Sequence, residues 1–458
     1  MSGAVETSTA STARVLASMP MVGELVEHLR RDGVRFGQGF FLFGIQHIMD
    51  QTLALCWALD ALGLPYDRIA LCGKAYSYCP EVAAELTALG VLVSPPRAYD
   101  PAISQASQMV QDLGELARRV AVRRAEVVNA TLLVLDDGGQ ALTNVSNLFP
   151  GPQHILGVEQ TASGFWQPGI SSIGMPVVDV GTSAVKSLCE PTVIIDTALR
   201  HAARSLERCG HGSRIGVVGL GHIGLQLSHA LKERGYALSV YDNRQDAYYH
   251  LDVERARRVH HVIETSDVIF GCTGSDITRD LAWETAQRGL SPGTREFVSL
   301  SSGDDEFFTL KQLLLTEGGA RADPYTPSNI PDISGQLWGS PLTIVRNGFP
   351  INFDNSRVSA SLSSIQGTMA ALIGALCQVH LAFTGRRTAP VAERIVLDLA
   401  LQRWLLKRWR EVLPAPLRFR TRSVANEPQD AMLMRLSQVR SDPVSIRAAP
   451  VFGSWADH

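Results

Sequence analysis

Short apolar runs alternate along this chain with longer stretches in which apolar residues recur at helical spacing. In the first part of the chain, the strand-like runs begin at Phe41, Ile69, Val91 and Thr131. Helical patterns cover residues 21–31, 51–62, 81–89 and 109–124, and residues 1–18 are predicted to be a flexible tail. Regular alternation of strands and helices is typical of a parallel sheet with crossover helices. The pattern therefore predicts a doubly wound α/β domain.

The second part of the chain repeats this alternation. A helix is predicted over 191–208, strands over 215–218 and 238–241, and further apolar units begin at His260, Val268, Glu296 and Leu342. A long apolar helix over 361–383 is more typical of core or a subunit interface than of a chemical site. The basic, tryptophan-bearing segment after it is interpreted as the solvated face of an interface helix, with a phosphate- or membrane-facing patch as the less favoured alternative. The predicted fold class is α/β, with two doubly wound Rossmann-like domains and a C-terminal helical segment.

A glycine-rich loop lies between the strands predicted at 215–218 and 238–241. Gly219, Gly221 and Gly224 have the spacing of a dinucleotide-binding turn. In such a turn the first glycine permits the tight bend, the second lets the backbone approach a pyrophosphate, and the third lets helix and strand pack closely. A helix that begins near His222 and Ile223 would direct its N-terminal amides at the phosphates. The loop predicts a bound dinucleotide.

An acidic residue at the end of the next strand supports this prediction. Asp242 follows the glycine loop by roughly twenty residues, the distance at which a carboxylate accepts from the ribose hydroxyls of the adenosine half. The carboxylate favours NAD as the cofactor. Arg244, two residues later, leaves NADP open.

Composition and charge narrow the class of protein. The 458 residues are 45% hydrophobic and 19% charged, which is ordinary for a multidomain globular enzyme, and the net charge of −3 argues against a nucleic-acid partner. The seven cysteines are scattered without metal-type pairing, as in reduced cytosolic proteins, so no metal site is predicted. No signal peptide and no membrane span are evident. We expect a cytoplasmic protein without a membrane partner.

Polar residues follow several predicted strands of the first domain. They are His47, residues 72–77 and residues 136–139. Because ligands of doubly wound sheets bind outside the carboxyl ends of the strands, these residues are predicted to form one cleft.

These landmarks, in this order, resemble the S-adenosylhomocysteine hydrolase (adenosylhomocysteinase) family over most of the chain, from about His47 to Ile373. The blocks that carry the resemblance are Gln46-His47 with Gln51-Thr52, the Asp136-Asp137-Gly138-Gly139 turn with Leu142-Thr143-Asn144, residues 157–164, residues 183–187 around Lys186, and the glycine loop. Weaker matches are Cys272-Thr273-Gly274 and Asn352. The resemblance implies a substrate-binding domain over 1–188, an NAD-binding domain over 189–350, a return to the first domain over 351–385 and an oligomerisation segment over 386–458.

The resemblance also implies a reaction and roles for individual residues. Tightly bound NAD oxidises the 3′-hydroxyl of an adenosine-type nucleoside, the resulting ketone acidifies the 4′ proton, a 5′ thiolate is eliminated, water adds, and the hydride returns. Lys186, beside a carboxylate, would serve the ribose, and His47 and Asp137 would supply acid–base groups on the 5′ side. Gln51 and Thr52 would lie near the adenine. Cofactor contacts are implied for Thr161, Ala162, Ser163, Thr273, Ser301 and Asn352.

The chain departs from the family at several of these positions. Gln160 stands where the family has the second glutamate of Glu-Glu-Thr-Thr-Thr, and an amide cannot accept a hydroxyl proton as a base. Glu190-Pro191 replaces Asp-Asn, so the carboxylate is kept with a longer reach and a backbone donor is lost. Residues 300–303 lack the family's histidine, and the Gly-His-Pro gate after Asn352 and the C-terminal Lys and Tyr have no counterpart.

These departures favour an adenosylhomocysteinase-like enzyme with an altered substrate or 5′ nucleophile, as in specialised nucleoside biosynthesis. The alternatives are an ordinary S-adenosylhomocysteine hydrolase and a non-catalytic NAD-binding regulator. A 2-hydroxyacid dehydrogenase is less favoured, because its Arg and Glu-His signatures are not evident. The resemblance implies a homodimer or homotetramer.

Overall fold

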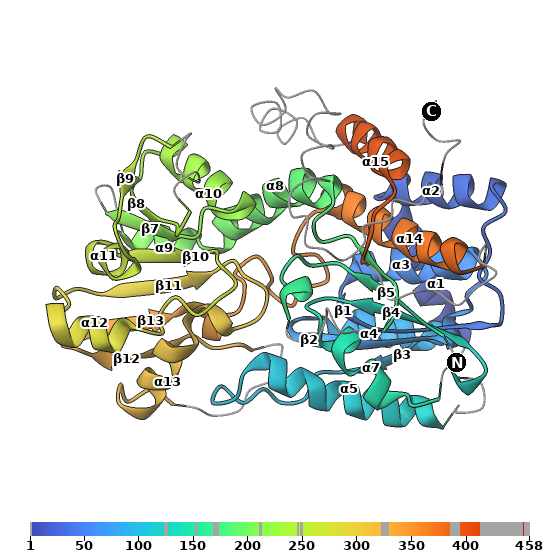
Figure 1. The fold of residues 1–458 in the computed structure, drawn as a ribbon, viewed down its shortest axis with the longest axis horizontal. Coiled ribbons are helices and arrows are strands. Elements are labelled where there is room, and N and C mark those ends of the chain that lie inside the picture. Colours follow the sequence, from blue (N-terminus) through green and yellow to red (C-terminus); the bar gives the residue numbers. More distant parts are fainter. Residues whose placement is uncertain are drawn as a thin grey trace. The chain divides into compact units, whose positions relative to one another are not determined.

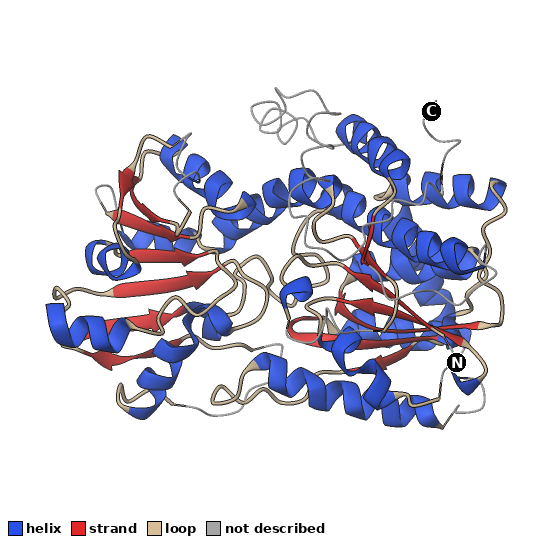
Figure 2. Ribbon diagram, in the orientation of Figure 1, coloured by secondary structure: helices blue, strands red, loops and turns tan. Residues whose placement is uncertain are grey.

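A computed structural model describes residues 2–122, 127–151, 154–167, 174–209, 213–244, 247, 251–321, 329–384, 394–412 and 452. The chain divides into two compact units. Unit 1 takes its described residues from 1–96, 109–190 and 356–458, and unit 2 takes them from 97–108 and 191–355. Each unit holds one seven-stranded sheet with helices around it, which confirms the predicted fold class of two doubly wound α/β domains (Figure 2).

The sheet of unit 1 is parallel throughout, in the order β14-β6-β5-β4-β1-β2-β3. Its strands are β1 (Phe40–Ile48), β2 (Ile69–Tyr78), β3 (Leu92–Ser94), β4 (Thr131–Asp136), β5 (Ile155–Glu159), β6 (Val177–Asp179) and β14 (Arg394–Val396). Every residue of β2 is buried, and almost every residue of β1 is buried too. Strands covered on both faces read as continuous apolar runs rather than alternating ones. That is the pattern seen at Phe41 and Ile69.

Helices cover both faces of this sheet (Figure 1). One face carries α1 (Ser2–Ala17), α2 (Pro20–Arg31), α3 (Asp50–Ala61), α4 (Pro80–Leu89), α14 (Leu362–Thr384) and α15 (Leu399–Val412). The other carries α5 (Gln105–Ala121) and α7 (Gln140–Leu148). Short 3-10 turns lie at η1 (Tyr66–Arg68) and η2 (Gly164–Trp166), and α8 (Ala184–His201) leads into unit 2.

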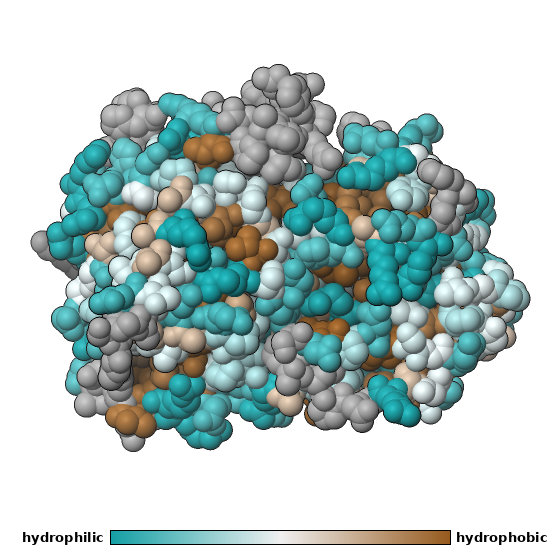
Figure 3. Space-filling view, turned by 180° about the vertical axis from the view of Figure 1, so that it is seen from behind, coloured by the Kyte–Doolittle hydropathy of each residue, from teal (hydrophilic) through white to brown (hydrophobic). Residues whose placement is uncertain are grey.

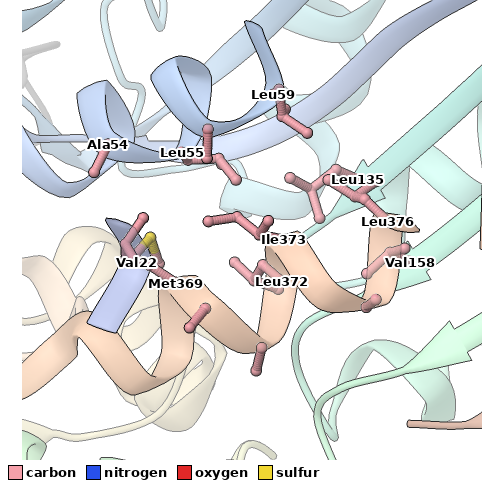
Figure 4. Close-up of a cluster of buried hydrophobic side chains, with 14 of the residues drawn as sticks. Val22, Ala54, Leu55, Leu59, Leu135, Val158, Met369, Leu372, Ile373 and Leu376 are labelled. Atoms are coloured by element: carbon pink, nitrogen blue, oxygen red, sulfur yellow. The ribbon is translucent and has the colours of Figure 1, made fainter. Parts of the chain in front are cut away.

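Helix α14 is the central element of the larger core. Its side chains Met369, Leu372, Ile373 and Leu376 pack between helices α2 and α3 and the strands β4 and β5 (Figure 4). The helix is long and apolar enough to cross a membrane, but 78% of its most apolar window is buried inside the protein. It is therefore a core helix, as the apolar pattern predicted.

Two local predictions were wrong. The expected tail over 1–18 is helix α1, which packs on α3 and α4 through Val15 and through small polar side chains such as Ser8. Small side chains give little apolar periodicity, so the sequence pattern concealed this helix. The helix expected from Pro191 begins at Ala184 instead and contains Pro191 in its interior. The boundary between the units falls at the same peptide, Glu190–Pro191.

The sheet of unit 2 has the order β12-β13-β11-β10-β7-β8-β9, parallel except for the β12–β13 pair. Its strands are β7 (Arg214–Val218), β8 (Ala237–Tyr241), β9 (Glu254–Arg255), β10 (Val268–Gly271), β11 (Arg295–Ser299), β12 (Ile333–Leu337) and β13 (Ser340–Ile344). One face packs against α8, α9 (Ala203–Cys209) and α10 (His222–Glu233). The other packs against α11 (Val259–Thr265), α12 (Leu281–Arg288) and α13 (Phe308–Thr316). The apolar unit at His260 thus lies in a helix, α11.

Short turns complete unit 2. They are η5 (Asp305–Phe307) and η6 (Val345–Gly348). The segment 97–108 also belongs to this unit, because Tyr99 and the backbone of Gln105 both donate to the buried carboxylate of Asp304. The domain boundaries expected at 188/189 and 350/351 lie close to those at 190/191 and 355/356, whereas the early crossing at 97–108 has no counterpart in the predicted boundaries.

The described part of the C-terminal segment belongs to unit 1. Helix α15 packs on α14, and Phe452 is buried in the same core. The remaining residues predicted as the oligomerisation segment lie outside the described residues, and that role stays a prediction. On the face of the molecule in Figure 3, hydrophilic residues predominate and apolar residues form small patches between them.

In each sheet the order in which successive strands are added reverses at one point, and a ligand site is expected at that point. In unit 1 the strand order reverses between β1 and β4, and in unit 2 it reverses between β7 and β10. Loops on either side of such a switch point run to opposite faces and leave a crevice at the carboxyl ends of the strands. The residues that follow these four strands are therefore the primary candidates for chemistry.

The burial of α14 can be measured with a matched pair of substitutions. Val379→Ala in α14 removes two methyl groups from a side chain that is 1% exposed. We expect it to lower the free energy of unfolding by about 2 kcal/mol, from lost apolar burial and a residual cavity. Val122→Ala alters a side chain that is 89% exposed and should change stability by less than about 0.5 kcal/mol. Denaturant titration of both variants checks this, and equal effects would contradict a core role for α14.

Candidate active site and dinucleotide site

His47 and Asp137 meet at the switch point of unit 1. His47 lies near the end of β1, and Asp137 directly follows β4, the strand paired with β1 in parallel register. The His47 Nε2 atom lies 3.0 Å from Asp137 Oδ2. The Asp137 side chain is 2% exposed and that of His47 is 15% exposed. The structure thus brings together two of the predicted catalytic residues.

A buried lysine that the sequence reading did not single out completes this pair. Lys74 is 3% exposed and places its Nζ atom against Asp137 Oδ1 and 3.1 Å from the hydroxyl of Tyr76. Strand β2 runs to Tyr78, well beyond the apolar run at Ile69 that marked it in the sequence. In the sequence, the only indication of a role for Lys74 was its position within the predicted cleft segment 72–77. Its pairing with Asp137 could be known only from the fold.

The ion pair determines the charge state of Asp137. Burial by itself would raise the pKa of this carboxyl, but the charge of Lys74, together with the hydrogen bonds from Lys74 and His47, outweighs burial and holds the pKa well below its ordinary value. In return, Asp137 overcomes the effect of burial on Lys74 and keeps the pKa of its ammonium group raised. Asp137 is therefore a carboxylate and Lys74 an ammonium over the whole physiological range.

Gln160, predicted to be catalytic, lies buried behind Asp137. Its Nε2 atom donates to Asp137 Oδ2, and its Oε1 atom accepts from Gln46 Nε2 at 2.9 Å. Both ends of the amide are thus hydrogen-bonded to protein. In this arrangement Gln160 orients Asp137, and a contact with the hydroxyls of a substrate stays a prediction.

A second pair of carboxyls, Asp136 and Glu159, builds the turn below Asp137. Glu159 accepts from the backbone N–H groups of Gly138 and Gly139 at 3.1 and 3.0 Å, and Asp136 accepts from the N–H of Leu142 at 2.8 Å. Both glycines have positive φ, 111° and 84°, which favours glycine in this turn. Burial, reinforced by the neighbouring Asp136, raises the pKa of Glu159 well above its ordinary value. These carboxyls hold the loop and leave Asp137 as the charged group of the site.

Lys186 and Glu190 form a second ion pair in unit 1. They lie at positions i and i+4 of α8, and 2.5 Å separates the Nζ atom from the carboxylate oxygens. The side chains are 9% and 19% exposed. Glu190 therefore reaches Lys186 despite the Pro191 that follows it. The predicted pairing of Lys186 with a carboxylate is present, and its catalytic role stays a prediction.

The remaining predicted residues of unit 1 lie in the first turn of α3 and in the loop after β5. Gln51 and Thr52 are buried in the first turn of α3, where Thr52 donates to the carbonyl of His47 and Gln51 contacts the sulfur of Met49 at 3.7 Å. The bond from Thr52 holds the end of β1, the strand that carries His47. Thr161, Ala162 and Ser163 follow β5, with Thr161 bonded to Glu159 through its N–H and its hydroxyl. Their contact with a dinucleotide stays a prediction.

The glycine loop of unit 2 has the geometry that dinucleotide binding requires. Gly219 has φ 92°, and a Cβ atom on Gly224 would lie 1.8 Å from the carbonyl oxygen of Gly219. A Cβ atom on Gly221 would meet nothing within 4 Å. The loop is therefore tight where β7 and α10 pack and open at Gly221, where a pyrophosphate would approach. His222 and Ile223 form the first turn of α10, so its amide groups point out of the same loop.

Asp242 follows β8 at the expected place, but its carboxylate already has partners. Oδ2 accepts from the N–H of Leu220 at 2.6 Å, and Oδ1 accepts from the N–H and the guanidinium of Arg244 at 2.8 and 3.2 Å. The Arg244 side chain is 52% exposed. A ribose hydroxyl that bonds to Asp242 would compete with this exposed arginine, which can instead turn to a 2′-phosphate. The geometry fits either NAD or NADP.

Thr273, Ser301 and Asn352 line the carboxyl edge of the same sheet. Glu306 accepts from the N–H groups of Thr273 and Gly274 at 2.9 and 2.8 Å, and Ser301 Oγ accepts from the N–H of Gly274 at 3.0 Å. Asn352 is 7% exposed, and its Oδ1 atom has no hydrogen-bond partner among the described residues. A buried polar atom without a partner is a candidate for ligand contact. Glu306, which shapes the loop, was not identified from the sequence.

A comparison with known protein families identifies the type of domain in unit 2. Residues 196–286 match the family model described as the D-isomer specific 2-hydroxyacid dehydrogenase, NAD binding domain. This range contains the glycine loop, Asp242 and Thr273. Unit 2 is thus an NAD(P)-binding Rossmann domain, and both cofactors remain open. The match covers less than half of the chain and leaves unit 1 unassigned.

Two relatives are proteins of Mycobacterium tuberculosis: Uncharacterized protein MT0113 of strain CDC 1551 / Oshkosh and Uncharacterized protein Rv0104 of strain ATCC 25618 / H37Rv. Each is 28% identical over 345 residues, which are 75% of this chain and 65% of the relative. The chain therefore spans just under two thirds of the length of these relatives.

Solved structures give weaker likenesses. A 2-hydroxyacid dehydrogenase from Ketogulonicigenium vulgare Y25 is 14% identical with a TM-score of 0.36, covering 78% of this chain and 99% of its own. An NADPH-dependent glyoxylate/hydroxypyruvate reductase from Sinorhizobium meliloti is 15% identical with a TM-score of 0.36, covering 58% and 86%. Likenesses of this strength carry no argument about function. The resemblance to S-adenosylhomocysteine hydrolase stays a prediction.

Two glycines of the loop separate cofactor binding from folding. Gly221→Ala places a methyl group in open space, so we expect an unchanged melting temperature and at least about tenfold weaker dinucleotide binding. Gly224→Ala forces a methyl group against the backbone of Gly219, so we expect a loss of stability of about 1–3 kcal/mol or more. Thermal unfolding and calorimetric titration with NAD and with NADP measure both effects. Dinucleotide binding that is unchanged in Gly221→Ala would contradict this site.

Proposed function

We propose that this protein is an NAD(P)-dependent enzyme that acts on S-adenosylhomocysteine or a related adenosine nucleoside. The reaction is transient oxidation of the 3′ carbon, followed by elimination and addition at the 5′ position. The substrate or the 5′ nucleophile differs from that of an ordinary adenosylhomocysteinase. Unit 2 supplies the dinucleotide, and unit 1 supplies the acid–base groups.

The observation that supports this proposal best is the Lys186–Glu190 pair. A lysine amine that lies 2.5 Å from a carboxylate can pass a proton from a sugar hydroxyl to solvent or back, which a 3′-oxidation needs. His47 and Asp137 form a second, separate acid–base pair in the same unit. Two such pairs suit a reaction with proton transfers at two places on one substrate.

The chemistry balances without a further reactant. NAD(P), held by the glycine loop of unit 2, would supply the acceptor for the hydride of the 3′ carbon and the donor that returns it at the end of the cycle. In between, a base takes the 4′ proton, the 5′ carbon–sulfur bond breaks with departure of a thiolate, and a nucleophile adds at the 5′ carbon with return of a proton to the 4′ carbon. Lys186 would take the proton of the 3′-hydroxyl, and His47 would exchange a proton with the leaving group or the incoming nucleophile.

The alterations around this machinery favour a changed nucleophile. Gln160 is bonded to Asp137 and Gln46, so it does not supply the carboxylate that the resembled family places at the ribose. An ordinary S-adenosylhomocysteine hydrolase is the first alternative, and a non-catalytic NAD(P)-binding regulator is the second.

A 2-hydroxyacid dehydrogenase is a different candidate, and the family match over 196–286 favours it. Such an enzyme transfers a hydride once and releases a ketone. It needs a cation to hold the substrate carboxylate, whereas Lys74, the lysine in contact with Asp137, is already paired with that carboxylate. The oxidation state of the dinucleotide after one turnover separates the two reactions: a dehydrogenase changes it, and the proposed cycle restores it.

The test uses the full-length protein loaded with NAD or NADP. With S-adenosylhomocysteine or adenosine, we expect a transient rise in reduced nicotinamide absorbance that returns to baseline. Lys186→Met should abolish this rise, because the amine that takes the 3′ proton is gone. Lys232→Met, which alters an exposed lysine of unit 2 paired with Asp252, should leave it unchanged.

Each other outcome points to one alternative. A transient rise together with release of both homocysteine and adenosine would identify an ordinary hydrolase, because only water as the nucleophile yields adenosine. Lasting cofactor turnover with a 2-hydroxy acid, and none with nucleosides, would identify a dehydrogenase. Bound dinucleotide that stays oxidised with every substrate would favour a regulator.

We further propose that the protein acts in the cytoplasm as a homodimer or homotetramer. Among the described residues, the one helix long and apolar enough to cross a membrane is α14, and most of it is buried in the core. Light scattering of the purified chain tests the oligomeric state.

A further inference from the structure

His47 is held by protein groups at both ring nitrogens. Nδ1 lies 2.6 Å from the hydroxyl oxygen of Ser77, and Nε2 lies 3.0 Å from Asp137 Oδ2. Ser77 is 0% exposed, so its hydroxyl is not placed to attack a substrate. The Ser77–His47–Asp137 chain therefore serves to orient the imidazole and to set its charge.

The Ser77 hydroxyl permits the ring to change its protonation state in place. With Asp137 ionised, Nε2 carries a proton and donates it to the carboxylate. In the neutral ring Nδ1 accepts from Ser77, and in the protonated ring Nδ1 donates to the same oxygen. A hydroxyl can do both, so the hydrogen bond between Nδ1 and Ser77 is kept in either state of the ring.

Whether His47 is neutral depends on the charges that face it. From β4 and the turn after it come Asp137 and, below it, Asp136, and from β2 come Lys74, Tyr76 and Ser77. Gln160 and Glu159 approach from β5 and the residue that follows it. Burial favours the protonated form of Asp136 and Glu159, because it raises the pKa of both carboxyls. Asp137 is then the ionised group in contact with the ring, and Lys74 is the ionised group in contact with Asp137.

These two charges act on His47 in opposite directions. A buried carboxylate that has a histidine as its sole cationic partner stabilises the imidazolium strongly and leaves a poor base. Here the carboxylate has Lys74 at its other oxygen, so one buried negative charge is already balanced. The second positive charge of an imidazolium gains less from the same carboxylate.

We propose that Lys74 is a positioning residue that balances the charge of Asp137 and so weakens the attraction of this carboxylate for a proton on His47. The assignment of an acid–base role to His47 rests on the proposed function. The charge balance itself rests on the contacts of Lys74 with Asp137 and Tyr76 and holds whatever the substrate is.

The test is a pH titration of the histidine ring signals in the NMR spectrum of the full-length chain, with His47 assigned by its loss in His47→Gln. In Lys74→Met the midpoint of the His47 titration should move to higher pH by at least about one unit, a tenfold rise in proton affinity, because Asp137 is then balanced by His47 alone. Lys232→Met serves as the matched control and should leave the midpoint in place.

A double variant separates charge from shape. Lys74→Met/Asp137→Asn removes both charges, so its His47 midpoint should fall below that of Lys74→Met. If Lys74→Met does not fold, recovery of folding in the double variant supports charge balance, and failure of both variants to fold overturns it.

A His47 midpoint that stays in place or moves down in a folded Lys74→Met chain also overturns the proposal. None of these measurements uses a substrate. A chain that does not react with nucleosides would therefore contradict the proposed function and would not affect the proposal for Lys74.

Discussion

A carboxylate that folding removes from water must be matched by positive charge, and unit 1 is organised around one such group. Asp137 is 1% exposed and follows β4 at the point where the strand order reverses. Lys74 and His47 balance it from β2 and β1, and Gln160 supports it from the residue after β5. Four adjacent strands thus converge on one side chain. Removing one partner of such a buried pair typically costs about 3–5 kcal/mol, so site and fold are bound together here.

The two units solve the same structural problem in the same way. At the end of β5 in unit 1, Glu159 accepts from two successive glycine N–H groups, and in unit 2 Glu306 accepts from the N–H groups of Thr273 and Gly274 after β10. Burial raises the pKa of both glutamates. In each unit a buried glutamate thus fixes the backbone of the loop through two N–H groups. The supporting glutamates are occupied by these bonds, so the other polar residues at the switch point of each sheet are the ones left for contact with ligands.

Much of the fold and of the dinucleotide site could be predicted from the sequence. The apolar runs at Phe41 and Ile69 are buried parallel strands, and the Gly219–Gly221–Gly224 loop and Asp242 lie where the dinucleotide pattern placed them. Helix α1 could not be predicted from the sequence, because its small polar side chains form no apolar stripe. They are buried only because α3 and α4 pack against them. The course of α8 was hidden by Pro191, whose presence favoured a helix start rather than a helix interior.

The sequence by itself determined the parallel α/β architecture, the dinucleotide loop and the identity of most polar residues at the strand ends, since these depend on local periodicity and spacing. The tertiary structure alone decided which of those residues meet. Lys74 and Asp137 are 63 positions apart, and Gln46 and Gln160 are 114 apart. Contacts at that range follow from strand order, because it determines which carboxyl ends stand side by side. The role of Gln160 as support for Asp137, and of Lys74 as its counter-charge, therefore appeared only with the folded sheet.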